Sequence, residues 1–212
     1  MKLSHELLLF PIFRFTRSRR MRRFERELKP KSTDRVLDIG GGCFNWQFVQ
    51  TPLHVTLLNL YRCPIDAEAP VDFESVEGDA TCMNYDDKSF EIGFSNSVIE
   101  HVGGSREQRK FADEVRRVSQ RIWIQTPAKE FFLEPHFLLP FVHWLPISFR
   151  RWLVPKFSPR RLGGKSNIEH LRDLVDEVRL LSKREMQEMF PDCRIITERF
   201  LLMPKAYIAV RD

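Results

Sequence analysis

The chain has 212 residues, of which 42% are hydrophobic and 30% are charged. This length can bury one core and is short for two ordinary domains, and this composition, ordinary for a soluble globular protein, points neither to disorder nor to a membrane span. The net charge of +5 is unevenly spread: residues 1–35 carry a net +7, Phe149 to Lys165 carry +6, and the remainder sums to −8. A partner for the positive charge is therefore expected at these two segments.

The cysteines and the apolar runs bear on the compartment of the protein. Cys43, Cys63, Cys82 and Cys193 form no C-x-x-C pair and have no histidine at zinc-finger spacing, so we expect reduced thiols and no metal ion. An N-terminal apolar run leads directly into basic residues, unlike a cleavable export signal. The longest charge-free apolar run, Phe137 to Phe149, is shorter than the roughly 20 residues of a membrane span. We expect a cytoplasmic protein, with peripheral contact to the inner face of a membrane as a further expectation.

Short apolar strands alternate with helical patterns along the first 127 residues, an order typical of a parallel sheet covered on both faces. The first strand is Arg35 to Ile39, and a brief helix follows from Phe44 to Val49. A longer helix is predicted from Ser105 to Ser119, with Ser105 as its N-cap. Further strands are predicted at His54–Leu60, Phe73–Ala80, Phe90–Ser95 and Arg121–Thr126.

The regular alternation stops after the fifth strand and returns near residue 182. We predict an insertion at about residues 129–181 that forms a lid, with a charged helix around Ile168 to Val178. Ser182 to Phe190 reads as a helix, because Ser182 and Glu185 have the spacing of a capping box. Two closing strands, from Cys193 to Leu201 and from Lys205 to Arg211, have too short a connection for a crossover helix and are predicted to be antiparallel.

These elements predict an α/β fold with a seven-stranded, mostly parallel, Rossmann-like sheet, an antiparallel last strand and helices on both faces. The predicted domain runs from residue 34 to residue 212 and carries the insertion. A basic helical segment, residues 1–33, precedes it.

The first strand runs into a glycine turn, in the stretch "VLDIGGGCFNW". A dinucleotide fingerprint would require glycine where the chain has Asn45, and a phosphate loop would require a following Gly-Lys-Ser/Thr. What remains is Asp-x-Gly-x-Gly, with Asp38 ahead of the glycines. Its carboxylate repels a pyrophosphate and suits a cationic amine or sulfonium.

Together with "GDA" and with "SNSVIEHV" after the fourth strand, this turn resembles the class I S-adenosylmethionine-dependent methyltransferases, in particular the methyltransferase type 11-like subgroup. The resemblance implies S-adenosylmethionine as cofactor. It places Gly40, Gly41 and Gly42 at the cofactor, with Gly40 and Gly42 beneath its methionine part and Asp38 orienting its amino group. The alternative for the glycines is a tight turn without a ligand.

The resemblance also assigns residues after the next three strands. Asn59 stands where the family has an acid that grips both ribose hydroxyls, so the charge-assisted hydrogen bond is absent. The other implied roles are an adenine-packing surface at Leu60, adenine recognition by Asp79 and the backbone amide of Ala80, and a floor below the sulfonium at Asn96. Asp79 can alternatively cap a turn.

The aromatic stretch from Thr126 to Pro146 has few polar groups, as buried ligand sites often do. We predict that His136 takes the proton of the methyl acceptor with the help of Glu134. The alternative is that the aromatics close a core and the histidines cap loops. Glu100 and His101 in "IEHV" fit packing and a helix start, because methyl transfer requires alignment more than it requires a strong base.

Aromatic residues accompany basic ones in residues 14–26 and 149–165. This mixture suits an anionic membrane surface or a lipid-linked acceptor, and suits a nucleic-acid backbone less well. A solvated face without a partner is the remaining explanation. The leading hypothesis is a methyltransferase with a small or lipid-linked acceptor. The alternatives are a methyltransferase-like binding module without turnover, favoured by Asn59 and the short helix after the glycines, and an RNA methyltransferase.

Overall fold

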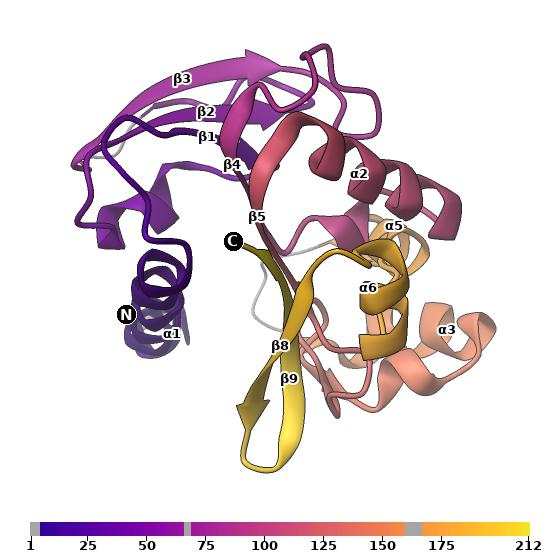
Figure 1. The fold of residues 1–212 in the computed structure, drawn as a ribbon. Coiled ribbons are helices and arrows are strands. Elements are labelled where there is room, and N and C mark those ends of the chain that lie inside the picture. The colour runs from indigo at the N-terminus through magenta and orange to yellow at the C-terminus, as the bar shows by residue number, and fades with distance from the viewer. Residues whose placement is uncertain (1–4, 66–68, 160–166) are drawn as a thin grey trace.

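A computed structural model describes residues 5–65, 69–159 and 167–212, with side chains from residue 14 onward. Its main sheet has seven strands in the order β3-β2-β1-β4-β5-β9-β8 (Figure 1). The first five strands are parallel to one another, and β9 is antiparallel to both β5 and β8. The strands are β1 (Arg35–Ile39), β2 (Leu53–Asn59), β3 (Val71–Glu77), β4 (Phe90–Asn96), β5 (Ser119–Pro127), β8 (Arg194–Phe200) and β9 (Met203–Arg211). The predicted fold class is confirmed, and every predicted strand forms within three residues of its predicted bounds.

The strand order places the glycine turn at the point where the sheet changes direction. The chain runs outward from β1 to β2 and β3, then returns to β4 on the other side of β1. Ligands of open α/β sheets bind beyond the carboxyl ends of the strands at such a reversal. The end of β1 is therefore the place in this sheet where a ligand is expected.

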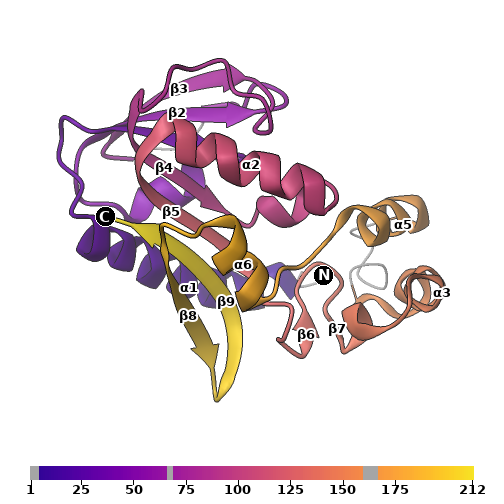
Figure 2. The same ribbon diagram turned by 45° about the vertical axis from the view of Figure 1, so that its right-hand side comes forward.

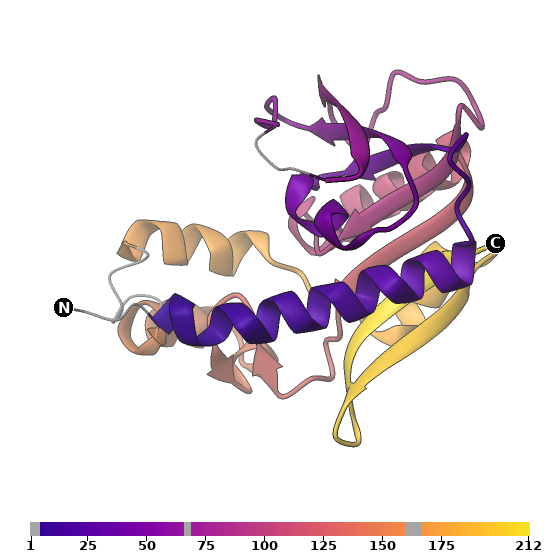
Figure 3. The same ribbon diagram turned by 90° about the vertical axis from the view of Figure 1, so that its left-hand side faces the viewer.

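One face of the sheet is covered by α1 (His5–Leu28) and by the short 3-10 helix η1 (Cys43–Phe48) (Figure 3). Phe24 of α1 is fully buried and makes edge contacts with Trp46, Phe94 and Trp123, at ring-centroid distances of 5.9, 5.4 and 5.8 Å. The brief helix predicted after the glycines is this 3-10 helix. No helix in the described part of the chain combines the length and the apolar character that a bilayer crossing requires.

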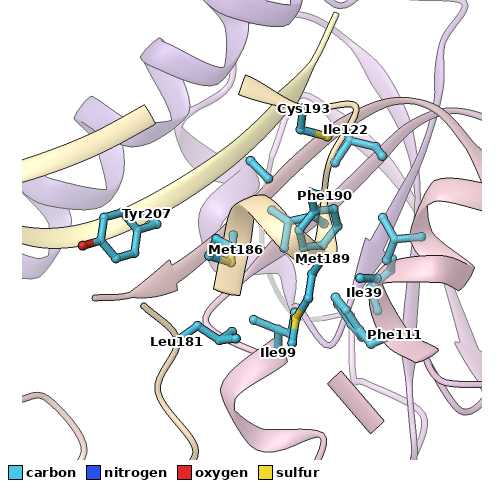
Figure 4. Close-up of a cluster of buried hydrophobic side chains, with 14 of the residues drawn as sticks. Ile39, Ile99, Phe111, Ile122, Leu181, Met186, Met189, Phe190, Cys193 and Tyr207 are labelled. Atoms are coloured by element: carbon cyan, nitrogen blue, oxygen red, sulfur yellow. The ribbon is translucent and has the colours of Figure 1, made fainter. Parts of the chain in front are cut away.

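The other face is covered by α2 (Ser105–Val118) and α6 (Lys183–Met189), whose apolar side chains meet over the sheet (Figure 4). The predicted capping box of α6 is present, because Ser182 and Glu185 each accept from the backbone of the other. The N-cap prediction for α2 was wrong. The amide of Gln108 donates to the carbonyl of Gly104 at 3.0 Å, so the first turn closes on Gly104, and Ser105 is already helical.

The insertion after β5 forms a small unit with its own apolar core. It contains the two-stranded sheet of β6 (Leu133–Glu134) and β7 (Leu139–Pro140), the short η3 (Val142–Trp144), and the helices α3 (Ile147–Phe157) and α5 (Ile168–Glu177). Only α5 was predicted, so the expectation of irregular structure over the rest was wrong. Figure 2 shows this unit beside the main sheet, reached from the end of β5. Its core residues are Phe137, Val142, Val154, Leu171 and Val175.

The two ends of the insertion are held together at the sheet. Ala128 bridges to Leu181, and the amide of Lys129 donates to the carbonyl of Leu181 at 3.0 Å. The amide of Arg179 donates to the carbonyl of Glu100 at 2.9 Å, which ties the returning chain to the segment after β4. The insertion therefore leaves and re-enters the fold at the carboxyl ends of β4 and β5.

Candidate functional site

The three glycines of the turn differ in whether the surrounding structure would allow a side chain at their position. Gly40 has a φ of +73°, and a side chain there would place its Cβ 2.5 Å from Cγ1 of Val98. A Cβ on Gly41 would lie 2.1 Å from both carboxylate oxygens of Asp38. Gly42 is extended, with a φ of −149°, and its Cβ would meet only the sulfur of Cys63, at an ordinary 3.5 Å. The tight-turn alternative therefore accounts for the first two glycines, while nothing described in the chain requires the third.

Asp38 lies beneath this turn and is fully buried. Its Oδ2 accepts a hydrogen bond from Nε1 of Trp46 at 2.8 Å, whereas Oδ1 has no hydrogen-bond partner among the described residues. Burial raises the pKa of Asp38 to about 7, and the hydrogen bond from Trp46 opposes part of this rise. A buried oxygen without a partner is costly, and a donor arriving from a ligand would satisfy it. The sequence predicted Asp38 but not its partner Trp46.

Asn59 ends β2 and is tied to the glycine turn. Its Nδ2 donates to the carbonyl of Gly41 at 3.0 Å. A carboxylate in this place would face that carbonyl oxygen with no proton to share, which gives a physical reason for the amide that departs from the family pattern. Leu60 and Tyr61 follow with 64% and 81% of their surface exposed, so an apolar surface adjoins the turn.

Asp79 lies in the turn after β3 and caps it. Its Oδ1 accepts from both the amide and the hydroxyl of Thr81, each at 2.8 Å. The turn-capping alternative is therefore present in the structure, and it engages one of the two carboxylate oxygens. Asp79 is exposed and Ala80 is half-buried beside it. Both follow the carboxyl end of β3, which lies at the same edge of the parallel sheet as the glycine turn after β1.

Asn96, at the end of β4, is bound by an arginine from α1. Its Oδ1 accepts from Nη1 of Arg20 at 2.7 Å, and the same Nη1 donates to Oε1 of Gln125 at 2.9 Å. Arg20 also pairs with the carboxylate of Glu198 at 2.6 Å. Sequence reasoning missed Arg20, because it treated the basic residues of this segment as surface charge. The sequence did contain an indication, because Arg20 is four residues before Phe24 and so lies on the same, core-facing side of the helix.

The two predicted acceptor-side residues are in contact. Glu134, in β6, is fully buried, and its Oε1 lies 2.6 Å from Nδ1 of His136. Its Oε2 accepts from the amide of Phe137 at 2.7 Å, so the carboxylate is fixed from both sides. The second histidine of the stretch, His143, instead lies 2.9 Å from the carbonyl of Lys129 through Nε2, as the loop-capping alternative describes.

Two residues that the sequence assigned to packing join His136. Glu100 and His101 belong to the 3-10 turn η2 (Ile99–His101) after β4, and Nε2 of His101 lies 3.0 Å from Nε2 of His136. The Nδ1 of His101 lies 2.8 Å from Oε1 of Glu177, at the end of α5. The structure thus places β4, β6 and α5 around one polar group that no single segment of the sequence reveals.

Glu100 is the buried member of this group. Its Oε2 accepts from the hydroxyl of Thr126 at 2.9 Å, and its Oε1 lies 4.0 Å from Nε2 of His136 with no hydrogen bond to any described residue. Burial raises the pKa of Glu100, and the nearby histidines and Thr126 oppose part of that rise. A cavity of about 280 Å³ adjoins the insertion, lined among others by Lys129, Glu134, His143 and Arg179.

Comparison with known families finds a match for the parallel part of this sheet. Residues 37–121, from β1 into β5, match the family described as "Methyltransferase domain". The matched residues make up less than half of the chain. The match and the strand order confirm the predicted class I methyltransferase fold, the class whose methyl donor is S-adenosylmethionine. The N-terminal helix α1, the insertion and the β8–β9 hairpin lie outside the matched segment.

Three solved structures are similar to this chain. An S-adenosylmethionine-dependent methyltransferase of Methanosarcina mazei has 13% identity and a TM-score of 0.45, covering 85% of this chain and 92% of its own. A protein of Pyrococcus horikoshii has 13% identity and a TM-score of 0.48, covering 98% and 88%. Magnesium protoporphyrin IX methyltransferase of Synechocystis, with S-adenosylhomocysteine bound, has 12% identity and a TM-score of 0.49, covering 94% and 84%. A search of curated proteins found no match.

Proposed function

We propose that this protein transfers the methyl group of S-adenosylmethionine to a small or lipid-linked acceptor that binds between the carboxyl edge of the sheet and the insertion. The observation that carries the proposal is the buried carboxylate of Asp38 beneath the glycine turn, with one oxygen that no described residue satisfies. A cationic amine or sulfonium at this turn would supply the missing donor or the compensating charge.

Each residue around the turn is proposed to bind a different part of the cofactor. The extended backbone of Gly42 leaves room for the methionine part. The amide group of Asn59 already donates to Gly41, so its Oδ1 is the atom left to accept a ribose hydroxyl. Leu60 offers an exposed apolar surface for adenine, and Asp79 keeps Oδ2 for the exocyclic amine while Oδ1 holds Thr81.

Methyl transfer is an in-line displacement at carbon. A lone pair of the acceptor forms a bond to the methyl carbon, the bond between sulfur and that carbon breaks, and the sulfonium becomes a neutral thioether. The acceptor must also lose a proton, and the proposed base is His136, whose Nδ1 is held by Glu134 at 2.6 Å and whose Nε2 lies 3.0 Å from Nε2 of His101. The main contribution of the protein is alignment, supplied by the turn on one side and the insertion on the other.

The exposed surface of the insertion supports membrane contact as part of the proposal. Trp144, Phe149, Trp152 and Phe157 are each at least half exposed on η3 and α3. Basic groups lie among them, and Nζ of Lys156 is 4.4 Å from the ring of Trp152. On α1, Arg19 lies over the exposed ring of Phe15. Figure 3 shows the N-terminal half of α1 and the helices α3 and α5 on the same side of the sheet. Residues 160–165 of the second basic segment lie outside the described residues.

Aromatic residues beside cations suit the interface of an anionic bilayer, where the ring occupies the headgroup level and the charge faces lipid phosphate. The predicted nucleic-acid alternative requires a continuous basic track for a phosphate backbone, and the exposed rings interrupt such a track on α3. We therefore propose an anionic lipid surface as the partner of these segments and retain RNA as the competing outcome.

Isothermal titration with S-adenosylmethionine and S-adenosylhomocysteine tests the first step. Binding of both is expected, and failure of both would refute the proposal. If the cofactor binds and is never consumed over a broad acceptor panel, the protein is a binding module. Flotation with liposomes, with and without anionic lipid, tests the membrane contact, and retention on RNA with steep salt dependence would favour the RNA alternative.

A further inference from the structure

The polar group around His136 has the composition and the arrangement of a metal site. Glu100, His101 and His136 each direct one ligand atom to a common place, with these atoms all within 4.8 Å of one another. The two Nε2 atoms are 3.0 Å apart, and Oε1 of Glu100 lies 4.0 Å from Nε2 of His136.

The far side of each imidazole is held by a carboxylate. Oε1 of Glu134 lies 2.6 Å from Nδ1 of His136, and Oε1 of Glu177 lies 2.8 Å from Nδ1 of His101. An ionised carboxylate only accepts, so each Nδ1 carries the proton. In two neutral rings of this tautomer, the two Nε2 atoms each carry a lone pair and repel each other across 3.0 Å. A cation between them would turn this repulsion into coordination, and carboxylate–histidine–metal pairs are the usual arrangement around protein-bound zinc.

The third ligand atom, Oε1 of Glu100, gives a separate line of evidence for a metal. Glu100 is fully buried and its Oε1 faces His136 with no hydrogen bond to any residue that the structure describes. A buried charged oxygen is costly unless it is paired or coordinates a metal. Thr126 holds the other oxygen at 2.9 Å, which fixes the carboxylate in the orientation that leaves Oε1 toward the rings.

We propose that Glu100, His101 and His136 bind a divalent first-row transition metal of the zinc type through Oε1, Nε2 and Nε2. Two nitrogen ligands at about 2.0–2.1 Å from a tetrahedral zinc lie about 3.3 Å from each other. The two Nε2 atoms are 3.0 Å apart, which is close to this separation. Oε1 of Glu100 lies 4.0 Å from Nε2 of His136 and would have to approach it by less than 1 Å on binding the metal. Imidazole ligands favour zinc, iron or nickel over magnesium and calcium.

This set of three ligands leaves at least one coordination position open, as catalytic zinc sites with two histidines and one glutamate do. The following role rests on the proposed methyltransferase function. The open position would take an oxygen of the acceptor, lower its pKa and release its proton to solvent, so that the oxygen attacks the methyl group as an anion. With the metal bound, the metal replaces His136 as the group that removes the proton.

The position of the metal site agrees with this role. Glu100 and His101 follow β4, Thr126 is the second-last residue of β5, and Val98, two residues before Glu100, packs on Gly40 of the cofactor turn. His136 and Glu177 belong to the insertion. A metal here would therefore connect the insertion to the sheet beside the cofactor turn, where the acceptor is proposed to bind.

The competing arrangement is an imidazolium that donates from one Nε2 to the other without any metal. Equilibrium dialysis of the chelator-treated full chain against Zn²⁺, followed by metal analysis, separates the two. We expect one zinc per chain, and a Co²⁺ adduct with visible absorption bands of a four- or five-coordinate site. His101→Ala should weaken zinc binding at least 100-fold, and Glu177→Gln, at a half-exposed position, should weaken it about 10- to 100-fold.

His54→Ala is the matched control, because His54 is an exposed histidine on β2 that also pairs with a carboxylate, Asp72, at 3.2 Å. It should leave the site at one zinc per chain. Absence of stoichiometric zinc, or zinc binding that His101→Ala and His54→Ala reduce equally, would overturn the proposal. Circular dichroism of each variant identifies loss of folding, in which case Glu177→Gln decides. Titration of the metal-free chain with S-adenosylmethionine tests the methyltransferase function separately, so either proposal can fail alone.

Discussion

Replacing Asp38 with asparagine should stabilise the protein at neutral and alkaline pH while weakening its binding of S-adenosylmethionine. Burial raises the pKa of Asp38 from its ordinary 3.8 to about 7. A pKa difference of about 3 corresponds to about 4 kcal/mol between the protonated and ionised forms. Asparagine has nearly the same shape, carries no charge, and keeps an oxygen that can accept from Trp46.

The pH window follows from the direction of this shift. Between about pH 4 and pH 7 the folded protein keeps the proton that the unfolded chain has already lost, so the free energy of unfolding falls as pH rises through this window. Above about pH 8 the contribution of Asp38 is constant. Asp38→Asn should therefore match the parent protein near pH 4 and exceed its free energy of unfolding by up to about 4 kcal/mol at pH 8.

Urea unfolding of both proteins at pH 4.5, 6, 7 and 8 measures this difference. Asp79→Asn, at an exposed carboxylate, is the matched control and should show no such trend. For the ligand, the parent protein should lose affinity as pH falls below about 7, by up to tenfold per pH unit, beyond any change seen in Asp38→Asn. A stability difference between Asp38→Asn and the parent that is equal at pH 4.5 and pH 8 would refute the argument from the buried charge.

Three other predictions follow from contacts of the fold. Phe24→Ala removes a fully buried ring between Trp46 and Trp123 and should lower the free energy of unfolding by about 3–5 kcal/mol in urea unfolding, and a loss below 1 kcal/mol would contradict the packing described. Asn59→Asp should cost about 1–3 kcal/mol at pH 8 by setting a carboxylate against the carbonyl of Gly41, and less at pH 4, where it can be protonated. Trp152→Glu should reduce flotation with anionic liposomes, whereas Leu201→Glu on the β8–β9 hairpin should not, and equal effects would argue against α3 as the contact.

The sheet was predictable because its signals are local. Each strand is a short apolar or alternating run bounded by turn residues, and the capping box of α6 needs only Ser182 and Glu185. The glycine turn was recognisable for the same reason. In contrast, α3 contains Pro155 and mixes basic with aromatic residues, so its sequence lacks a clear apolar stripe, and its stability comes from packing on α5 inside the insertion.

The parts of the site that sequence reasoning missed depend on residues far apart in the chain. Arg20 meets Glu198 across 178 positions, and His101 meets Glu177 across 76. Neither pair has a spacing that a motif can carry, because the contacts arise only when α1 crosses the sheet and the insertion folds back onto η2. Glu134 and His136 were found together because they are two residues apart on one strand end.

The N-terminal helix α1 extends between two regions of the molecule. Its last turns are locked into the core by Phe24, and Arg20 grips the amide at the end of β4, while its first turns extend away from the sheet toward the side of the insertion (Figure 3). Because α1 spans His5 to Leu28, its first turns and the contact between Arg20 and Asn96 belong to one helix. Under the proposed function, a membrane contact of the first turns of α1 and the cofactor site would therefore share one helix, with Arg20 as its contact to the end of β4.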